Sequence, residues 1–452
     1  MESTQRGVVV TIAIIILVSS LGNLSQTALN AMLIAVSADF GITTALSQWA
    51  TTIYMLVLGI VVPVVPFLMR RYSLKSVIVA CCVLMVGGAA IDWLAPDFAV
   101  LMCGRVMQAL SAGITIPMMM SVVMQSFPPE RRAGVMGIAG IAMGFSPNIG
   151  PTIGGVFVDL WGWRSFFATL FVLSLLLFVV AAVVLKHAEA PDSSARLDAA
   201  SLVLSSVGLG GLLLGFSNAS SFGPLSVQVW VPVIGGAVFF ALFVWRQGRV
   251  DHSLIRLAVM DSWRYRAGFW SMNFLWASFM CITLLTPLFI QNVQGGSALD
   301  AGFALLVGAL VALVGNPLAG FACDKFGARP IVCLASVLLV AGAAPMVWAT
   351  ADMPFWLIVL LQGIRQAGVS CLIGPMNTWS MNDLTPSHMT DGSSFGTVVR
   401  QACASFSTAF VVLLVTIVPD MFGSVILGYQ AGYGLSALCA IAVAVINFAK
   451  IR

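Results

Sequence analysis

Three arginines stand inside stretches that are otherwise long and apolar, namely Arg105, Arg365 and Arg400. A charged side chain within a membrane span costs roughly 2.5 kcal/mol or more, and it normally faces the protein interior with a partner. A desolvated guanidinium favours a bidentate oxyanion. These arginines therefore predict an electropositive cavity for neutral or anionic molecules. In the alternative, helix carbonyls, Gln108, Gln366 or water satisfy Arg105 and Arg365, which are then structural.

A polar stripe near the N-terminus could line the same cavity. Asn23, Gln26, Thr27 and Asn30 are spaced i, i+3, i+4 and i+7, which places them on one face of a helix. The alternative is that these side chains hydrogen-bond between helices and hold them together. Aromatic and amide residues complete the predicted substrate cavity, unless they face lipid or the membrane interface: Trp49, Tyr54, Gln108, Asn273, Trp276, Asn377 and Trp379.

The elements that must position these residues are membrane-spanning helices. Of the 452 residues, 60% are hydrophobic and 8% are charged, against roughly 25% charged in a soluble domain. An apolar stretch of about 20 residues crosses the hydrocarbon core as a helix. Nine runs lack charge, three hold one arginine each, and the last is long enough for two helices, which predicts an all-α protein with about fourteen spans: 7–38, 40–69, 76–91, 133–158, 165–185, 267–299, 301–323, 330–351, 421–449; 98–129, 353–382, 392–419; 199–245.

The positive charges predict the orientation. With the N-terminus in the cytoplasm and an even number of spans, seventeen of the 21 lysines and arginines fall on the cytoplasmic side. Both termini are then cytoplasmic. The first run is too long, and lacks a small-residue cleavage site, for a removable signal peptide, so we expect it to stay as the first helix of a multi-pass protein.

The sequence lacks a convergent set of catalytic or metal-binding residues. The histidines, His187, His252 and His388, fall in expected cytoplasmic loops, and the nine cysteines lie in or beside apolar runs without ligand spacing. No phosphate-binding GxxxxGK[ST] loop is present. We therefore expect no enzymatic activity, no metal, no cofactor and no nucleic-acid partner, and a carrier driven by a gradient.

Two polar segments suggest three parts. Residues 1–190 would form one six-helix bundle, 191–250 a linker with two inserted helices, and 251–452 a second six-helix bundle. A glycine, an arginine and a proline recur in the fourth helix of each bundle, within 104–117 and 363–375. Such duplication predicts two halves with pseudo-two-fold symmetry and a substrate site where they meet.

Two sets of residues could serve conformational gating. Small residues along 140–155 allow close backbone approach, so this helix is expected at the interface between the halves, as a seal or pivot or as plain close packing. Asp324 could accept from a neighbouring helix N-terminus and pair with Arg329 to hold an inner gate, or be a solvated loop charge. The gating set comprises Gly150, Pro151, Gly154, Gly155, Asp324 and Arg329.

Several motifs follow one another in order along nearly the whole chain. They are Gln48-Trp49 with Tyr54; Arg105, Gln108 and Gly113; Gly150-Pro151-Thr152-Ile153-Gly154-Gly155; Gly162-Trp163-Arg164; Pro287 with Gln291; Ala301-Gly302; Gly320, Asp324, Gly327 and Arg329; and Arg400-Gln401. Together they resemble the major facilitator superfamily, in particular its fourteen-span drug:proton antiporter branch. The resemblance implies alternating access and efflux of small amphipathic molecules across a bacterial-type inner membrane.

The chain departs from that branch where a helix 1 aspartate is usual, because Ser25 stands there. The acidic residues fall in loops or near helix ends, so no carboxylate is expected at the centre. If protons are coupled, Asp92 and Asp391 are the first candidates. The alternative function is uptake or exchange of an organic anion without proton coupling through helix 1.

Overall fold

The computed structural model describes residues 2–140, 145–185, 198–223, 226–250, 256–296 and 298–451. All regular elements in these ranges are helices, which confirms the all-α class. The linker predicted at 187–197, with His187, and the loop around His252 lie outside the described residues.

The helices divide into an N-terminal group, an inserted pair and a C-terminal group. The N-terminal group consists of α1 (Glu2–Phe40), α2 (Thr44–Ser47), α3 (Trp49–Val61), η1 (Val62–Val64), α4 (Val65–Arg71), α5 (Leu74–Leu94), α6 (Phe98–Ser126), α7 (Pro129–Gly140), α8 (Ser146–Trp161) and α9 (Trp163–Val184). The inserted pair is α10 (Ala199–Phe222) and α11 (Val227–Gln247). The C-terminal group consists of η3 (Leu257–Asp261), α12 (Trp263–Asn292), α13 (Ala298–Phe326), α14 (Ala328–Ala343), η4 (Ala344–Trp348), α15 (Phe355–Met381), α16 (Pro386–Phe422) and α17 (Val425–Lys450).

Twelve helices among the described residues are long and apolar enough to cross a membrane, so the protein is a multi-pass membrane protein. One of these spans, Trp49–Arg71, joins α3, η1 and α4 around Pro63 and Pro66. The other two predicted spans correspond to α10, with its shorter apolar stretch Ala199–Gly215, and to α7 with α8. Since α7 and α8 lie on either side of 141–144, outside the described residues, the count of fourteen stays a prediction.

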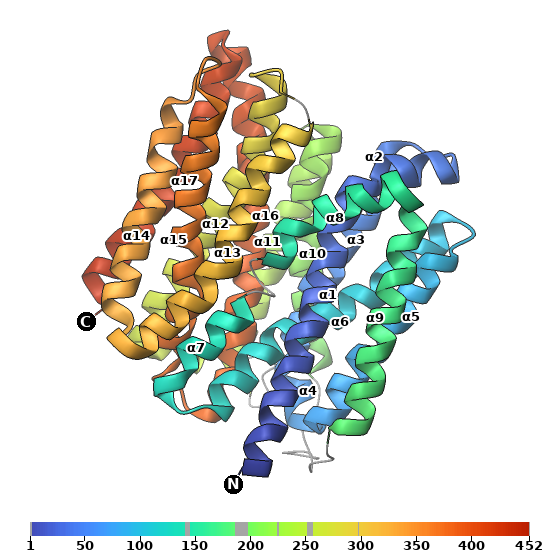
Figure 1. The fold of residues 1–452 in the computed structure, drawn as a ribbon, viewed down its shortest axis with the longest axis vertical. Coiled ribbons are helices and arrows are strands. Elements are labelled where there is room, and N and C mark those ends of the chain that lie inside the picture. Colours follow the sequence, from blue (N-terminus) through green and yellow to red (C-terminus); the bar gives the residue numbers. More distant parts are fainter. Residues whose placement is uncertain are drawn as a thin grey trace.

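The N-terminal and C-terminal groups stand side by side (Figure 1). In the N-terminal group α1 packs on α8 and α6, and α5 packs on α6 and α9. In the C-terminal group α12 packs on α16 and α17, and α15 on α13 and α14. The groups meet mainly where α7 packs on α13 and α15, and where α6 packs on α16. Both termini lie toward the lower end in Figure 1, while the side of the membrane on which they lie stays a prediction.

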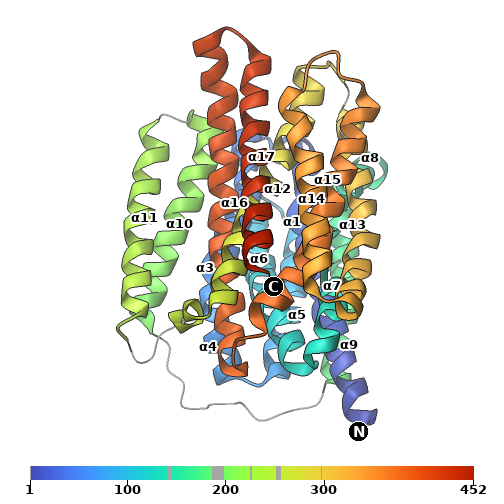
Figure 2. The same cartoon turned by 90° about the vertical axis from the view of Figure 1, so that its left-hand side faces the viewer.

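The inserted helices α10 and α11 pack on each other at one flank, beside α16 and α3 (Figure 2). Asp198 holds their predicted cytoplasmic ends together, since it caps α10 through Ser201 and pairs with Arg246 of α11 at 3.2 Å. Partial burial acts to raise the pKa of Asp198, but hydrogen bonds from Arg246 and Ser201 outweigh it, so this pKa lies below its usual value.

A tight connection sets the register of α5 against α6. Asp97 caps α6, because its Oδ1 accepts from the backbone amide of Val100 at 2.9 Å. The two helices then run antiparallel in close contact. The last turns of α5 therefore face the first turns of α6, where Arg105 lies.

Candidate functional site

Arg105 is fully buried and hydrogen-bonds to three helices of the N-terminal group. It lies about 10 Å along α6 from the start of that helix. Its Nη1 atom donates to Ser25 Oγ of α1 at 2.7 Å and to Gln108 Oε1 at 2.9 Å. Its Nε donates to the carbonyl of Ala50 in α3 at 3.3 Å. A serine, an amide and backbone carbonyls therefore supply the direct partners of Arg105.

A carboxylate reaches this cluster from α5. Asp92 is fully buried, and Gln108 Nε2 donates to its Oδ2 at 2.8 Å. The other carboxylate oxygen, Oδ1, and Nη2 of Arg105 have no hydrogen-bond partner among the described residues. Asp92 thus lies near the end of α5, where the sequence places it, and its carboxylate is still linked to a buried arginine through Gln108. Gly104 makes the contact with α6 possible, because a Cβ at that position would overlap Asp92 Oδ1.

Tyr54 closes the cluster from α3. The guanidinium carbon of Arg105 lies 4.4 Å from the centroid of its ring, in a cation–π arrangement. The hydroxyl of Tyr54 donates to the carbonyl of Gly22 in α1 at 2.8 Å. We call Ser25, Tyr54, Asp92, Arg105 and Gln108 the Arg105 cluster. Trp49, predicted for the same cavity, is 38% exposed instead.

The polar stripe of α1 divides between several environments. Asn23 is buried, Gln26 and Thr27 are half-buried, and Asn30 is exposed. The Thr27 hydroxyl donates to the carbonyl of Asn23 on its own helix at 3.1 Å. Thr27 also lies against Gly150 of α8. At Thr27 the stripe therefore serves the packing of α1 on α8 by steric contact, and its hydrogen bond stays within α1 and does not join two helices.

The glycines predicted for gating belong to two different contacts. A Cβ on Gly150 would overlap Thr27, and one on Gly154 would overlap the carbonyl of Ala28, so α8 closes on α1 within the N-terminal group. Pro151 is half-buried in α8, whereas an added Cβ on Gly155 would meet nothing within 4 Å. The interface between the groups is formed instead by α7, whose glycines at 134, 137 and 140 lie against Asn316, Gly320 and other residues of α13. The expected position between the halves therefore holds for α7 and not for Gly150 and Gly154.

Asp324 binds the start of α7, as expected from its position at the end of α13. Its carboxylate accepts from the backbone amides of Ala133 at 3.1 Å and Gly134 at 2.6 Å. The predicted ion pair with Arg329 is wrong, because Arg329 is exposed and no ion pair joins the two side chains in the part of the chain that the structure describes. The sharp turn at Gly327, with φ of 84°, separates the two helices that carry them.

Arg365 occupies a comparable place in the C-terminal group. It is buried, its Nε donates to Gln362 Oε1 at 3.1 Å, and Gln362 donates in turn to Thr286 of α12. Its guanidinium lies 5.6 Å from the ring centroid of Phe279. Its partner is thus Gln362 rather than the expected Gln366. No ion pair joins Arg365 to a carboxylate within the described ranges.

Unpaired polar atoms and aromatic rings gather beside Arg365. Trp276 packs edge-on against Phe279, with ring centroids 5.5 Å apart. The Nε1 of Trp276, the Oδ1 of Asn273 and the Nη1 of Arg365 are buried without a hydrogen-bond partner among the described residues. These residues come from α12 and α15, which pack on each other. We call Asn273, Trp276, Phe279 and Arg365 the Trp276 cluster.

The remaining predicted residues lie elsewhere. Asn377 donates to the carbonyl of Ile373 on its own helix at 2.9 Å, and Trp379 packs edge-on against Trp263 with centroids 5.7 Å apart. Since Asn377 lies twelve residues beyond Arg365, it is about 18 Å along α15 from the Trp276 cluster. Arg400 of α16 is buried, and its Nη2 donates to Thr397 at 2.8 Å and contacts Met120 Sδ of α6 at 3.7 Å.

Polar contacts that the sequence reasoning missed join α16 to the N-terminal group. Ser121 and Thr390 share a hydrogen bond of 2.5 Å, and Ser393 donates to the carbonyl of Pro117 at 3.1 Å. Asp391, 2% exposed inside α16, lies 3.9 Å from Arg70 of α4. The only sequence signal is the run of small and polar residues at 390–397. With Arg132, which donates to Asn382 at 2.9 Å, and Asp324, these contacts form what we call the inner latch, at the end predicted to be cytoplasmic.

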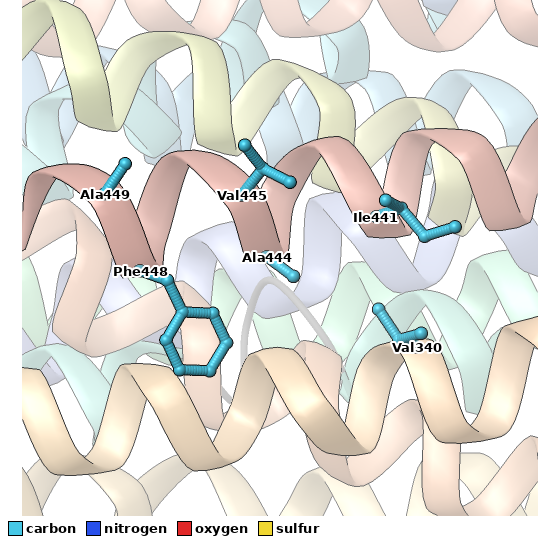
Figure 3. Close-up of a pocket in the computed structure, with 6 residues that line it drawn as sticks. All are labelled: Val340, Ile441, Ala444, Val445, Phe448 and Ala449. Atoms are coloured by element: carbon cyan, nitrogen blue, oxygen red, sulfur yellow. The ribbon is translucent and has the colours of Figure 1, made fainter.

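A large apolar depression lies away from these clusters. It measures about 520 Å³ and is formed by Val340 of α14 and five residues of α17 (Figure 3): Ile441, Ala444, Val445, Phe448 and Ala449. None of the residues predicted for the substrate cavity belongs to it.

Comparison with known proteins agrees with this architecture. The uncharacterized MFS-type transporter YhcA of Bacillus subtilis is 32% identical over 398 residues, 87% of this chain and 74% of the relative. The lincomycin resistance protein LmrB of Listeria monocytogenes is 29% identical over 410 residues, 90% of this chain and 86% of the relative. The solved proton:xylose symporter XylE aligns with a TM-score of 0.66 over 99% of this chain and 96% of its own, at 12% identity, which shows a shared fold.

The model of the Major Facilitator Superfamily matches residues 15–408, the greater part of the chain. This superfamily consists of transporters rather than enzymes, and the multi-pass helical fold fits that role. The chain therefore belongs to the Major Facilitator Superfamily of membrane transporters.

Proposed function

We propose that this transporter exports small amphipathic molecules, neutral or anionic, across a bacterial-type inner membrane by alternating access. The observation that carries the proposal is the Trp276 cluster, where buried donors and an acceptor without partners lie beside aromatic rings. Sites for small molecules combine an apolar lining with a few such polar groups. The name of a relative, lincomycin resistance protein LmrB, supports efflux of a drug-like molecule.

The charge of the Trp276 cluster favours a neutral or anionic substrate. Arg365 and Arg400 are buried cations, and within the described ranges neither forms an ion pair with a carboxylate. A desolvated guanidinium binds a carboxylate, sulfate or phosphate group through charge-assisted hydrogen bonds. A cationic substrate would add to a positive charge that is already uncompensated.

The inner latch supports alternating access. Its polar contacts join the N-terminal and C-terminal groups near one end of the helices, through single hydrogen bonds and one long ion pair. A neutral hydrogen bond contributes only about 0.5–1.5 kcal/mol net, so the set can open without unfolding either group. Opening of this end would connect the Trp276 cluster to the predicted cytoplasmic side.

Transport of three dyes by the purified protein in liposomes tests the proposal. The dyes are an anionic, a neutral and a cationic amphiphile, namely anilinonaphthalene sulfonate, phenylnaphthylamine and ethidium. We expect saturable movement of the first two against their own concentration gradients. Trp276→Ala should lower this rate about tenfold, whereas Trp348→Ala, at a residue 74% exposed on the surface, should not change it. Failure of all three dyes to exchange would refute the proposal. Gradient-independent movement of the sulfonate would favour an organic-anion facilitator instead.

A further inference from the structure

We propose that Asp92 is the proton-binding residue that couples transport to a proton gradient, with Gln108 linking its carboxylate to Arg105. The inference rests on the proposed transport function and adds the coupling ion and its site. It starts from an observation that helix packing alone does not explain. The carboxylate of Asp92 is fully buried, with one oxygen bound to the amide of Gln108 and the other unpaired. Gln108 alone separates it from the fully buried guanidinium of Arg105.

Gln108 is held in one orientation between the two charges. Its Oε1 accepts from Arg105 Nη1 at 2.9 Å and from Ser25 Oγ at 2.5 Å. Its Nε2 therefore has to face Asp92, to which it donates at 2.8 Å. The amide dipole thus places its positive end on the carboxylate and its negative end on the guanidinium, which favours Asp92 as an anion and Arg105 as a cation.

Asp92 is the only carboxylate that the described residues bring to the Arg105 cluster. Arg105 comes from α6, which packs on α5, and Tyr54 comes from α3, which packs on α6. Ser25 is the residue with which α1 meets Arg105, and it carries no charge. At the end of α5 that holds Asp92, α1 and α9 present Asp39 and Arg164, which pair with each other.

Two further charged residues lie far from Asp92. Arg70 and Arg71 of α4 lie at the opposite end of α5. Asp97, at the start of α6, is engaged in capping that helix. Within the described surroundings, Asp92 is thus the carboxylate that compensates Arg105.

Protonation has a definite consequence in this setting. With Asp92 ionised, the cluster is neutral overall; a proton on the unpaired Oδ1 leaves it with the charge of Arg105. A buried cation without a counter-charge is costly. The protonated cluster is thus stabilised by any arrangement of the helices that brings water to the guanidinium. Proton binding by Asp92 thus changes which packing of α1, α3, α5 and α6 is favoured. Release of the proton restores the neutral cluster and the original packing.

The C-terminal group supplies an internal comparison. Arg365, Gln362 and Thr286 also form a chain of arginine, amide and partner, but here the amide donates to a threonine hydroxyl of α12 and not to a carboxylate. A threonine hydroxyl does not ionise at physiological pH and so cannot take up and release a proton as a carboxylate does. The structure thus assigns proton binding to one group and leaves Arg365 free for substrate.

The test compares Asp92→Asn with Asp391→Asn, at the second buried acid, and with Asp352→Asn, at an exposed loop residue. Asparagine keeps the size of Asp92 and an oxygen for Gln108. We expect Asp92→Asn to lose acceleration of anilinonaphthalene sulfonate and phenylnaphthylamine transport by an imposed pH gradient, and to keep dye exchange without a gradient. The Asp352→Asn variant should keep the acceleration. Asp391→Asn removes a contact of the inner latch and so changes the rate itself, but it should keep the ratio of the rates with and without the pH gradient. Proton uptake or release on dye binding, followed with a pH indicator in detergent, should vanish only in Asp92→Asn.

A second variant guards against simple loss of folding. Because Ser25 Oγ lies 2.7 Å from Arg105 Nη1, Ser25→Asp in the Asp92→Asn background returns one carboxylate to the cluster. We expect this pair to regain the response to pH, which a merely misfolded protein cannot do. Wild-type dye transport against its concentration gradient that is driven by a sodium gradient or by membrane potential, and is insensitive to the pH gradient, would overturn the inference and leave the proposed function standing, as would an Asp92→Asn protein with unchanged coupling.

Discussion

Arg105 shows how a charged residue is accommodated within a membrane span. Hydrogen bonds to a serine, an amide and backbone carbonyls, together with the ring of Tyr54, cover most of its guanidinium. Each neutral partner spreads the charge, while Asp92 compensates it through Gln108. Every member of the cluster is buried, so its side chains are held by packing as well as by hydrogen bonds.

Gly104 offers a residue-level test of this packing. We predict that Gly104→Ala destabilises the protein by about 1–3 kcal/mol, the usual cost of overpacking, because the added methyl group would displace Asp92. Gly363→Ala is the matched control in the C-terminal group, where a Cβ would meet only Val307 at 3.8 Å. Thermal unfolding in detergent measures both. Equal melting temperatures for the two variants would contradict the close contact between Gly104 and Asp92.

At the level of elements, the apolar runs predict the helices well. Twelve spans follow directly from runs such as 98–129 and 353–382, because lipid leaves the backbone little choice but a helix. The pairing of side chains could not be predicted in the same way. Asp92 lies near the end of a run and reads as peripheral, and only the antiparallel register of α5 and α6 brings it to Arg105.

The contact between α1 and α8 gives a prediction at this level. Gly154→Leu should block dye transport, because a side chain there would overlap the carbonyl of Ala28 and force the two helices apart. Gly155→Leu, one residue further on, should transport normally, since nothing lies within 4 Å of its added Cβ. The measurement is the dye transport rate of the two variants at matched protein levels. Equal rates would rule out a role in transport for the close approach of α8 to α1.

In the whole molecule, the N-terminal and C-terminal groups are joined by the inner latch and by the glycines of α7. The small residues let the backbones touch, and the polar contacts lie at one end only of α6 and α16. The sequence predicts two halves from the repeated arginine helices, but contacts such as Ser121 with Thr390 come from residues 269 positions apart and have no local signal.

A crosslink across the inner latch tests whether it must open. The double variant Ser121→Cys, Thr390→Cys places two thiols where the hydroxyl oxygens lie 2.5 Å apart, a separation that allows a disulfide. We predict that oxidation stops dye transport and that reduction restores it. The single Ser121→Cys variant should be indifferent to both treatments. Undiminished transport by the oxidised double variant would mean that this end stays closed throughout the cycle.

The inserted helices have a consequence for the route by which a substrate arrives. Because α10 packs on both α3 and α16, it bridges the N-terminal and C-terminal groups along one flank (Figure 2). On this flank, α10 and α11 therefore lie between the lipid and the two groups of helices. Any sideways entry from the lipid must take place on another flank, so the flanks of this transporter are not equivalent for a hydrophobic molecule in the bilayer.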